Sequence, residues 1–259
     1  MVLFSRTLST SMLLPLLGIF LLASGASAFN QYQEWPTDER MPRTRKRPLP
    51  SRQITTAEAV RISSILLIGG GFILLYWTPL ICFALGIFNV IWYNGIYTFL
   101  KRKTAFAVVP GAITGAVPVL MGWTALGGNS LDPPVVFLAF FLFLWQMPHF
   151  WLLMLKYGEE YHHAGFPVLT DLFKPTQIKV IVMMWLLASG VASLFLLFFG
   201  IIHHSFFGHA IPAGMVALLS LIFFQLFLAV KINYRLIFSA ANLFMLLVLI
   251  TLILDNLFH

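Results

Sequence analysis

Charged residues are scarce in this sequence, and long parts of it have none. Asp, Glu, Lys and Arg make up 10% of its 259 residues, whereas soluble domains average about 25%. Residues 62–100 and 180–230 contain none of these four types. Each stretch is long enough for two membrane crossings, at about 20 apolar residues per helix. The scarcity of charge therefore excludes an ordinary soluble enzyme and a disordered chain.

Cysteine is nearly absent as well. Cys82 is the single cysteine, so the chain cannot be a disulfide scaffold. The apolar runs are continuous and lack the alternation of polar and apolar residues that a transmembrane β-barrel shows. The sequence predicts an all-α fold, a polytopic membrane helix bundle of about eight transmembrane helices. The predicted helices are residues 9–29, 62–78, 80–98, 106–126, 135–155, 178–200, 210–230 and 236–256.

Acidic residues are fewer than basic ones, 9 against 16. Fifteen of the basic residues fall into four clusters separated by pairs of predicted crossings, so these clusters share one side of the membrane. The positive-inside rule predicts that this is the cytoplasmic side of the inner membrane. Membrane topology therefore accounts for the excess of positive charge, and we expect no nucleic-acid partner.

The N-terminal segment is similar to a signal peptide. Arg6 is followed by an apolar run and by Ala26-Ser27-Ala28, which resembles a cleavage site. A cleaved precursor would begin on the far side of the membrane, whereas the basic cluster that follows favours the cytoplasmic side. We therefore expect an uncleaved first helix.

Three polar residues follow the first predicted helix at intervals of four: Asn30, Glu34 and Asp38. If the helix continues, they share one face. Oxygen ligands of this kind suit Mg²⁺, which takes one or two carboxylates and completes its shell with water and substrate phosphates. Pro36 interrupts the pattern and is expected to kink the helix.

Basic residues in two connections complete a potential anion site. Arg43 and Arg47 continue the four-residue interval, and their guanidinium groups are suited to phosphate oxygens. Lys101 and Arg102 follow Tyr97 in a short connection on the same side. The alternative is that these cations serve only to fix the topology.

A third group of polar residues lies in and after the fifth predicted helix. Glu159 and Glu160 are placed to hold a second Mg²⁺ opposite the first acidic set. Gln146 and His149 lie within an apolar span, where polar groups tend to face a cavity or the bundle interior. For His149 the alternative is a hydrogen-bonded packing role. Tyr161 follows the two glutamates.

Two acidic sets and several cations at one end of an apolar bundle are suited to a Mg²⁺-bound diphosphate with an apolar tail. Loss of diphosphate from an allylic carbon leaves a carbocation, so the cavity has to exclude water and offer aromatic rings. This pattern favours a Mg²⁺-dependent prenyltransferase. A non-catalytic lipid or anion transporter is the alternative, although transporters commonly place polar groups near the membrane midplane.

Three motifs resemble those of the UbiA superfamily of intramembrane prenyltransferases, in the same order and at similar intervals. They are Asn30-x3-Glu34-x3-Asp38-x2-Met41-x-Arg43-Thr44-x2-Arg47-Pro48-Leu49-Pro50, the segment from Tyr97-Thr98 to Gly122-Trp123, and Trp145-Gln146-x-Pro148-His149-Phe150 followed by Glu160-Tyr161-x2-Ala164-Gly165-x-Pro167. Within the superfamily, the resemblance is to the branch that farnesylates heme.

The resemblance implies a single prenyltransferase domain over residues 1–259 that lacks the family's first helix, since members usually have nine. It implies farnesyl transfer from farnesyl diphosphate to a vinyl group of heme b, giving heme O, with Mg²⁺ as cofactor. The lipid bilayer is the setting, and heme A synthase or terminal oxidase assembly is an implied partner. A quinone precursor or another aromatic acceptor is the alternative.

The resemblance also implies roles for individual residues. The catalytic set is Asn30, Glu34, Asp38 and Glu160, and the metal ligands are the same four with Glu159. The substrate-binding set is Arg43, Arg47, Lys101, Arg102, Tyr97, His149, Gln146 and Tyr161.

Overall fold

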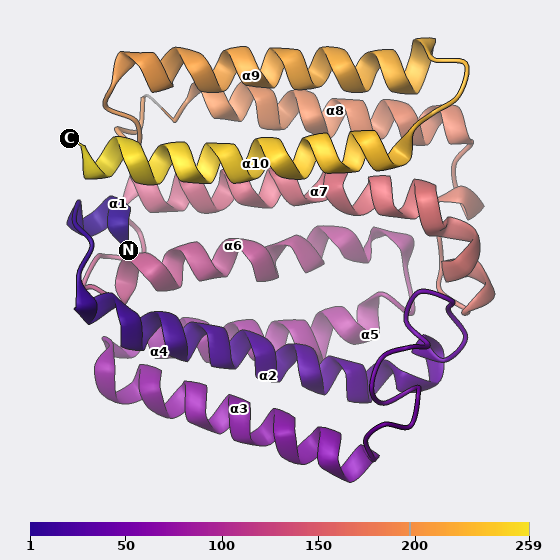
Figure 1. The fold of residues 1–259 in the computed structure, drawn as a ribbon, viewed down its shortest axis with the longest axis horizontal. Helices are drawn as coiled ribbons and strands as arrows, with labels where there is room; N and C mark the ends of the chain where they lie inside the picture. The colour runs from indigo at the N-terminus through magenta and orange to yellow at the C-terminus, as the bar shows by residue number, and fades with distance from the viewer. Residues whose placement is uncertain (197, 259) are drawn as a thin grey trace.

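The chain folds into a bundle of helices that run alternately in opposite directions (Figure 1). The computed structural model describes residues 1–196 and 198–258. The helices are α1 (Val2–Ser5), α2 (Leu13–Asp38), α3 (Thr56–Trp77), α4 (Leu80–Val90), the π-helix η2 (Ile91–Tyr97), α5 (Thr98–Leu100), α6 (Val108–Thr124), α7 (Pro133–His163), α8 (Pro175–Leu194), α9 (Ser205–Phe223), the π-helix η5 (Phe224–Leu228) and α10 (Tyr234–Leu257).

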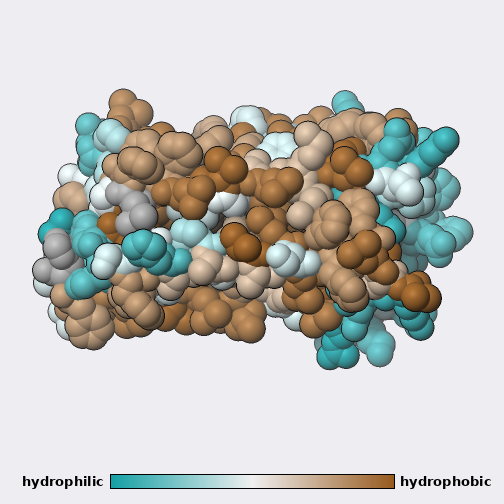
Figure 2. Space-filling model, turned by 90° about the horizontal axis from the view of Figure 1, so that it is seen from above, coloured by the Kyte–Doolittle hydropathy of each residue, from teal (hydrophilic) through white to brown (hydrophobic). Residues whose placement is uncertain are grey.

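The predicted all-α membrane bundle is confirmed. Within the described residues, eight helical segments are long and apolar enough to cross a membrane. Seen from above, an apolar band separates two more polar ends (Figure 2). The bounds differ from prediction at several helix ends. α2 and α7 extend farther, to Asp38 and His163, and α8 ends earlier, at Leu194.

The bundle has two halves that meet at α6 and α7. One apolar core joins α2, α3, α4 and α6, around Leu22, Leu74 and Met121. A second and larger core extends from α6 through α7 to α10, around Phe141 and Ile222. α6 contacts α7, and α7 also contacts α8 and α10. The chain therefore passes from one half to the other directly from α6 to α7.

Glycines bring α2 and α3 into close contact. A Cβ added at Gly70 of α3 would lie 2.7 Å from the backbone nitrogen of Leu22 and 2.8 Å from the backbone oxygen of Gly18. A Cβ at Gly25 would meet the backbone nitrogen of Leu67 at 2.8 Å. Membrane helices associate through packing of this kind, because lipid offers no hydrophobic drive between them.

The end of α2 extends beyond the apolar run. The helix includes Pro36 and ends at Asp38. The chain then turns back, and the Thr44 hydroxyl donates a hydrogen bond of 2.9 Å to the Asp38 carbonyl oxygen. A capping box begins α3: the Thr55 side chain accepts from the backbone of Glu58, and the Glu58 carboxylate accepts from the backbone of Thr55. The polar end of α2 is thereby held by local contacts.

The opposite end of the bundle is fastened by the last turn of α10. The buried Asp255 carboxylate accepts hydrogen bonds from the backbone nitrogens of His203 and His204, at 2.7 and 2.8 Å. The Asn256 side chain donates to the Ile201 carbonyl oxygen at 3.0 Å. These bonds satisfy backbone groups in the connection between α8 and α9, which would otherwise be costly to bury.

Candidate functional site

A cavity of about 310 Å³, here called the polar cavity, lies where the two halves meet. Side chains from α2, η2, α6 and α7 line it, together with the segments that follow α2, α5 and α7. The lining residues are Asn30, Glu34, Asp38, Met41, Arg43, Thr44, Arg47, Tyr93, Tyr97, Lys101, Thr104, Ala105, Ala107, Val108, Thr114, Phe150, Leu153, Met154, Tyr161, Phe166 and Pro167.

The polar face of α2 forms one wall of this cavity. Asn30, Glu34 and Asp38 lie in a continuous helix and all line the cavity, as their spacing predicts. They are 6%, 6% and 2% exposed. The Asn30 side-chain nitrogen donates to the Thr98 hydroxyl at 2.9 Å, so the Asn30 side-chain oxygen is not used in that bond. Their role as metal ligands stays a prediction.

Both carboxylates are paired with cations. An Arg47 nitrogen lies 2.7 Å from Asp38 Oδ2, and Lys101 Nζ lies 2.6 Å from Glu34 Oε1. The buried Glu34 Oε1 therefore has the Lys101 ammonium as its close contact. Burial lowers the pKa of the Lys101 ammonium, and the neighbouring Glu34 opposes this shift. The ion pairs compensate charges that are costly to bury alone.

The segment after α2 contacts the last turns of α7 and the residues that follow α7. An Arg43 nitrogen donates to the Tyr161 hydroxyl at 3.1 Å, and the Arg43 guanidinium lies 5.8 Å from the centre of the Tyr157 ring. Met41 packs with Ala164 and Phe166 in a small apolar cluster. The first and third motifs are thus brought together, as the sequence predicts.

Glu159 and Glu160 depart from the prediction. They line a separate depression with His162, His163 and Asp171, and neither lines the polar cavity. The cavity wall on α7 is formed by residues such as Phe150 and Tyr161. Neighbouring residues on a helix point about 100° apart. Because Tyr161 faces the cavity, the side chain of Glu160 points away from it. The expectation of two acidic sets facing one cavity is therefore corrected: the first set lines it alone among the described residues.

Three other predicted substrate-binding residues also lie outside the cavity lining. Gln146 packs over Gly115 of α6, where its side chain occupies the space that a Cβ would need. The His149 Nδ1 lies 2.9 Å from the Asn242 side-chain oxygen of α10. Arg102 donates to the Gln33 carbonyl oxygen at 2.6 Å. These contacts correct their predicted placement at the polar cavity: Gln146 and His149 make contacts between helices, and Arg102 is an exposed residue bonded to the backbone of α2.

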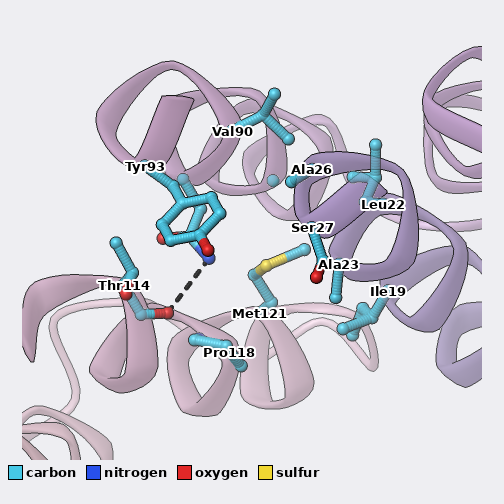
Figure 3. A pocket seen from close by; sticks show the side chains of 12 residues that line it. Ile19, Leu22, Ala23, Ala26, Ser27, Val90, Tyr93, Thr114, Pro118 and Met121 are labelled. Atoms are coloured by element: carbon cyan, nitrogen blue, oxygen red, sulfur yellow. Dashed lines mark hydrogen bonds between the residues drawn. The ribbon is translucent and has the colours of Figure 1, made fainter. Parts of the chain in front are cut away.

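A second cavity of about 250 Å³, here called the apolar pocket, lies between α2, α4 and α6 (Figure 3). Its wall is mostly aliphatic. The lining residues are Ile19, Leu22, Ala23, Ala26, Ser27, Gly86, Asn89, Val90, Tyr93, Thr114, Pro118 and Met121. Two of them, Tyr93 and Thr114, also line the polar cavity. The two cavities are therefore neighbours with a common wall.

Tyr93 was not among the residues that the sequence motifs singled out. It lies four residues before Tyr97, and the two rings are stacked with centroids 5.8 Å apart. The interval of four, which identified the acidic face of α2, was the available signal. The residue stands inside an apolar span, where aromatic side chains are common in any membrane helix.

The arrangement combines three chemical properties. Oxygen ligands and cations surround the polar cavity, an apolar pocket adjoins it, and the aromatic ring of Tyr93 lines both. No group of three or more His, Cys, Asp or Glu that could hold a metal occurs in the described residues. Mg²⁺ needs few protein carboxylates, however, because water and phosphate complete its shell. The site thus fits a metal shared with an anionic substrate better than a closed protein cage.

Comparison with known proteins gives a consistent family. Residues 4–254 match the model of the UbiA prenyltransferase family. The protoheme IX farnesyltransferase of Geobacter sulfurreducens is 38% identical over 186 residues, covering 72% of this chain and 68% of that protein. The protein of the same name from Bdellovibrio bacteriovorus is 44% identical over 155 residues, covering 60% and 53%. The chain thus spans about half to two thirds of these relatives' length.

Two solved structures share the fold. A digeranylgeranylglyceryl phosphate synthase superposes with a TM-score of 0.78 at 16% identity, covering 100% of this chain and 90% of the other. A UbiA homolog from Aeropyrum pernix K1 gives a TM-score of 0.70 at 15% identity, covering 96% and 92%. At such low identity the likeness concerns the arrangement of helices.

Proposed function

This chain belongs to the UbiA prenyltransferase family, and we propose that it transfers a farnesyl group from farnesyl diphosphate to a vinyl group of protoheme IX, giving heme O. Residues 1–259 act as a single prenyltransferase domain in this proposal. The acceptor and the prenyl length are those in the names of the curated relatives. The reaction class is supported by the site itself.

The observation that carries the proposal is the common wall of the polar cavity and the apolar pocket. A prenyl diphosphate has a charged head and a hydrocarbon tail, and the two cavities offer a matching pair of environments side by side. Arg43, Arg47 and Lys101 face the first cavity, where cations would hold the diphosphate oxygens. The aliphatic wall of the second would take the tail and keep water from the reacting carbon.

The donor set around the polar cavity fits Mg²⁺. Glu34 lines this cavity with its carboxylate against the Lys101 ammonium, and Asn30 and Asp38 add oxygen atoms along the same helix face. We propose that these three residues hold Mg²⁺ together with the diphosphate. The chemistry that Mg²⁺ supplies when bound is neutralisation of the charge on the leaving diphosphate. Before substrate arrives, Arg47 and Lys101 balance the two carboxylates.

We infer the location in the cell from the basic segments. Cations from the connections after α2 and η2 lie at the end of the bundle that holds the polar cavity. Positive charge of this kind favours the cytoplasmic face. We propose that the protein lies in the inner membrane, with the polar cavity facing the cytoplasm and farnesyl diphosphate entering from that side.

The test uses the purified protein of residues 1–259 in nanodiscs with labelled farnesyl diphosphate and heme b. We expect a farnesylated heme that forms with Mg²⁺ and disappears with EDTA. Asp38→Asn should lower the rate at least 100-fold, since removal of one such electrostatic contact costs about 10²–10³ in rate. Glu39→Gln is the matched control, because Glu39 is the next residue and is exposed.

Other outcomes would contradict parts of the proposal. Transfer of the label to an added quinone precursor but not to heme would identify a different acceptor. Mg²⁺-independent movement of farnesyl diphosphate into liposomes, without release of diphosphate, would indicate a transporter. Equal rates for Asp38→Asn and Glu39→Gln would remove Asp38 from the site.

A further inference from the structure

The wall between the two cavities marks where a bound prenyl diphosphate is cleaved. Tyr93 and Thr114 are the residues common to both linings. If the diphosphate occupies the polar cavity and the tail occupies the apolar pocket, the carbon–oxygen bond that joins them crosses this wall. The reacting carbon is therefore beside these two side chains, and the phosphate-binding cations are on one side of it.

We propose that Tyr93 is a catalytic residue whose ring faces the allylic carbon and stabilises its positive charge as diphosphate leaves. This inference rests on the proposed prenyl transfer and adds a residue to it. An aromatic face attracts a cation, and the attraction is strongest where water is excluded. Tyr93 is the aromatic residue shared by the two cavities among the described residues, and Figure 3 shows its ring among the side chains that line the apolar pocket.

The helix that carries Tyr93 places it between head and tail. Asn89, Tyr93, Tyr97 and Lys101 follow one another at intervals of four residues. Asn89 lines the apolar pocket, Tyr97 and Lys101 line the polar cavity, and Tyr93 lines both. Tyr93 lies in the π-helix η2, a widened turn that occurs frequently at functional sites. Four residues of helix rise about 6 Å, so Tyr93 is separated by two such steps from Lys101, whose ammonium would hold phosphate.

A buried oxygen beside Tyr93 supports the same position for positive charge. The Asn89 side-chain nitrogen donates to the Thr114 carbonyl oxygen at 3.1 Å, the bond drawn dashed in Figure 3. The Asn89 side-chain oxygen is buried and has no hydrogen-bond partner in the described residues. Burying an unpaired oxygen is costly. In an apolar pocket its partial negative charge would stabilise an allylic cation that forms nearby.

The step balances without an oxidant or reductant. The bond between the allylic carbon and the diphosphate oxygen breaks, and its electron pair leaves with diphosphate. The vinyl group of the acceptor then supplies its π electrons to form the new carbon–carbon bond, which moves the positive charge to the carbon next to the porphyrin. A water molecule adds there and gives up a proton to solvent, leaving a hydroxyl group. Tyr93 acts in the first of these steps and transfers no atom.

The experiment replaces Tyr93 by phenylalanine and by phenylalanines with one, two and three ring fluorines. Fluorine withdraws electrons from the ring face while changing its size little. Diphosphate release is measured in a single turnover, and the affinity for the unreactive farnesyl thiodiphosphate is measured separately. The same series at Phe88 is the matched control, because Phe88 lies on the same helix, is 43% exposed and lines neither cavity.

We expect Tyr93→Phe to keep the rate within about threefold, and each added fluorine to lower it, to a total of about 30-fold. Affinity for the thiodiphosphate should stay constant, and the Phe88 series should be flat. Equal rates across the Tyr93 series would overturn the inference, as would a loss confined to affinity. If the unmodified protein releases no diphosphate, the proposed function fails instead, so the two failures are distinguishable.

Discussion

Two neighbouring glycines of α3 provide a sharp test of the packing between α2 and α3. A Cβ at Gly70 would lie 2.7 Å and 2.8 Å from backbone atoms of α2, whereas a Cβ at Gly69 meets nothing within 4 Å. Ordinary contacts between carbon and other heavy atoms are about 3.5–4.0 Å. Gly70→Ala therefore forces the helices apart by about 1 Å, because a backbone cannot rotate out of the way.

The expected free-energy changes have opposite signs at these two positions. Overpacking costs about 1–3 kcal/mol, and the clash at Gly70 takes the upper part of this range, about 2–3 kcal/mol, because it is with backbone atoms. Replacing glycine by alanine in a helix stabilises by about 1 kcal/mol. Gly70→Ala should thus destabilise by about 1–2 kcal/mol, whereas Gly69→Ala should stabilise by about 0.5–1 kcal/mol. Gly71→Ala, whose Cβ would meet Phe83 at an ordinary 3.7 Å, should also stabilise by about 0.5–1 kcal/mol.

The assay is thermal unfolding of the three variants in one detergent, followed by loss of helical signal and by aggregation. For a chain of this size 1 kcal/mol corresponds to about 2–4 °C in Tm. We expect Tm to fall by about 2–8 °C for Gly70→Ala and to rise by about 1–4 °C for Gly69→Ala. A shift of the same sign in both variants would refute the close backbone approach between α2 and α3.

Three further predictions concern polar contacts. Lys101→Met leaves Glu34 buried without its cation and should lower the free energy of unfolding by about 3 kcal/mol or more. The double variant with Glu34→Gln should recover more than half of this loss in SDS titrations. Strictly additive losses would contradict an energetic coupling between the two side chains. Asp255→Ala removes the acceptor for two backbone N–H groups and should speed amide hydrogen exchange at His204, with a loss of about 2 kcal/mol; unchanged exchange there would show that the carboxylate does not hold this connection. Thr55→Ala breaks the capping box of α3 and should cost about 1 kcal/mol in thermal unfolding, and an unaltered Tm would count against the cap.

The membrane bundle and the first half of the site could be predicted from the sequence. Long uncharged stretches specify crossings directly, because a backbone in lipid has to form helix. The interval of four from Asn30 to Asp38 placed three oxygen-bearing side chains on one face, since the helix continues through Pro36. Both features depend on local sequence, which is why they could be derived without a fold.

The second half of the site depended on how α7 is rotated. One residue along a helix turns the side chain by about 100°, so sequence proximity to a motif did not reveal that Tyr161 faces the cavity and Glu160 does not. The same holds for Gln146, which packs against Gly115 on α6. Tyr93 was missed because its position is defined by the meeting of two cavities, a property of the assembled helices.

The length of α7 bears on how a substrate reaches the site. Its 31 residues rise about 46 Å, against a hydrocarbon layer of about 30 Å. The last turns are therefore expected in the headgroup zone, at the level where Tyr161 lines the polar cavity. An amphiphile dissolved in the leaflet already has its ionic group at that depth and its chain directed inward. It can move sideways into the protein without turning over, so the bilayer itself orients the molecule before the first contact is made.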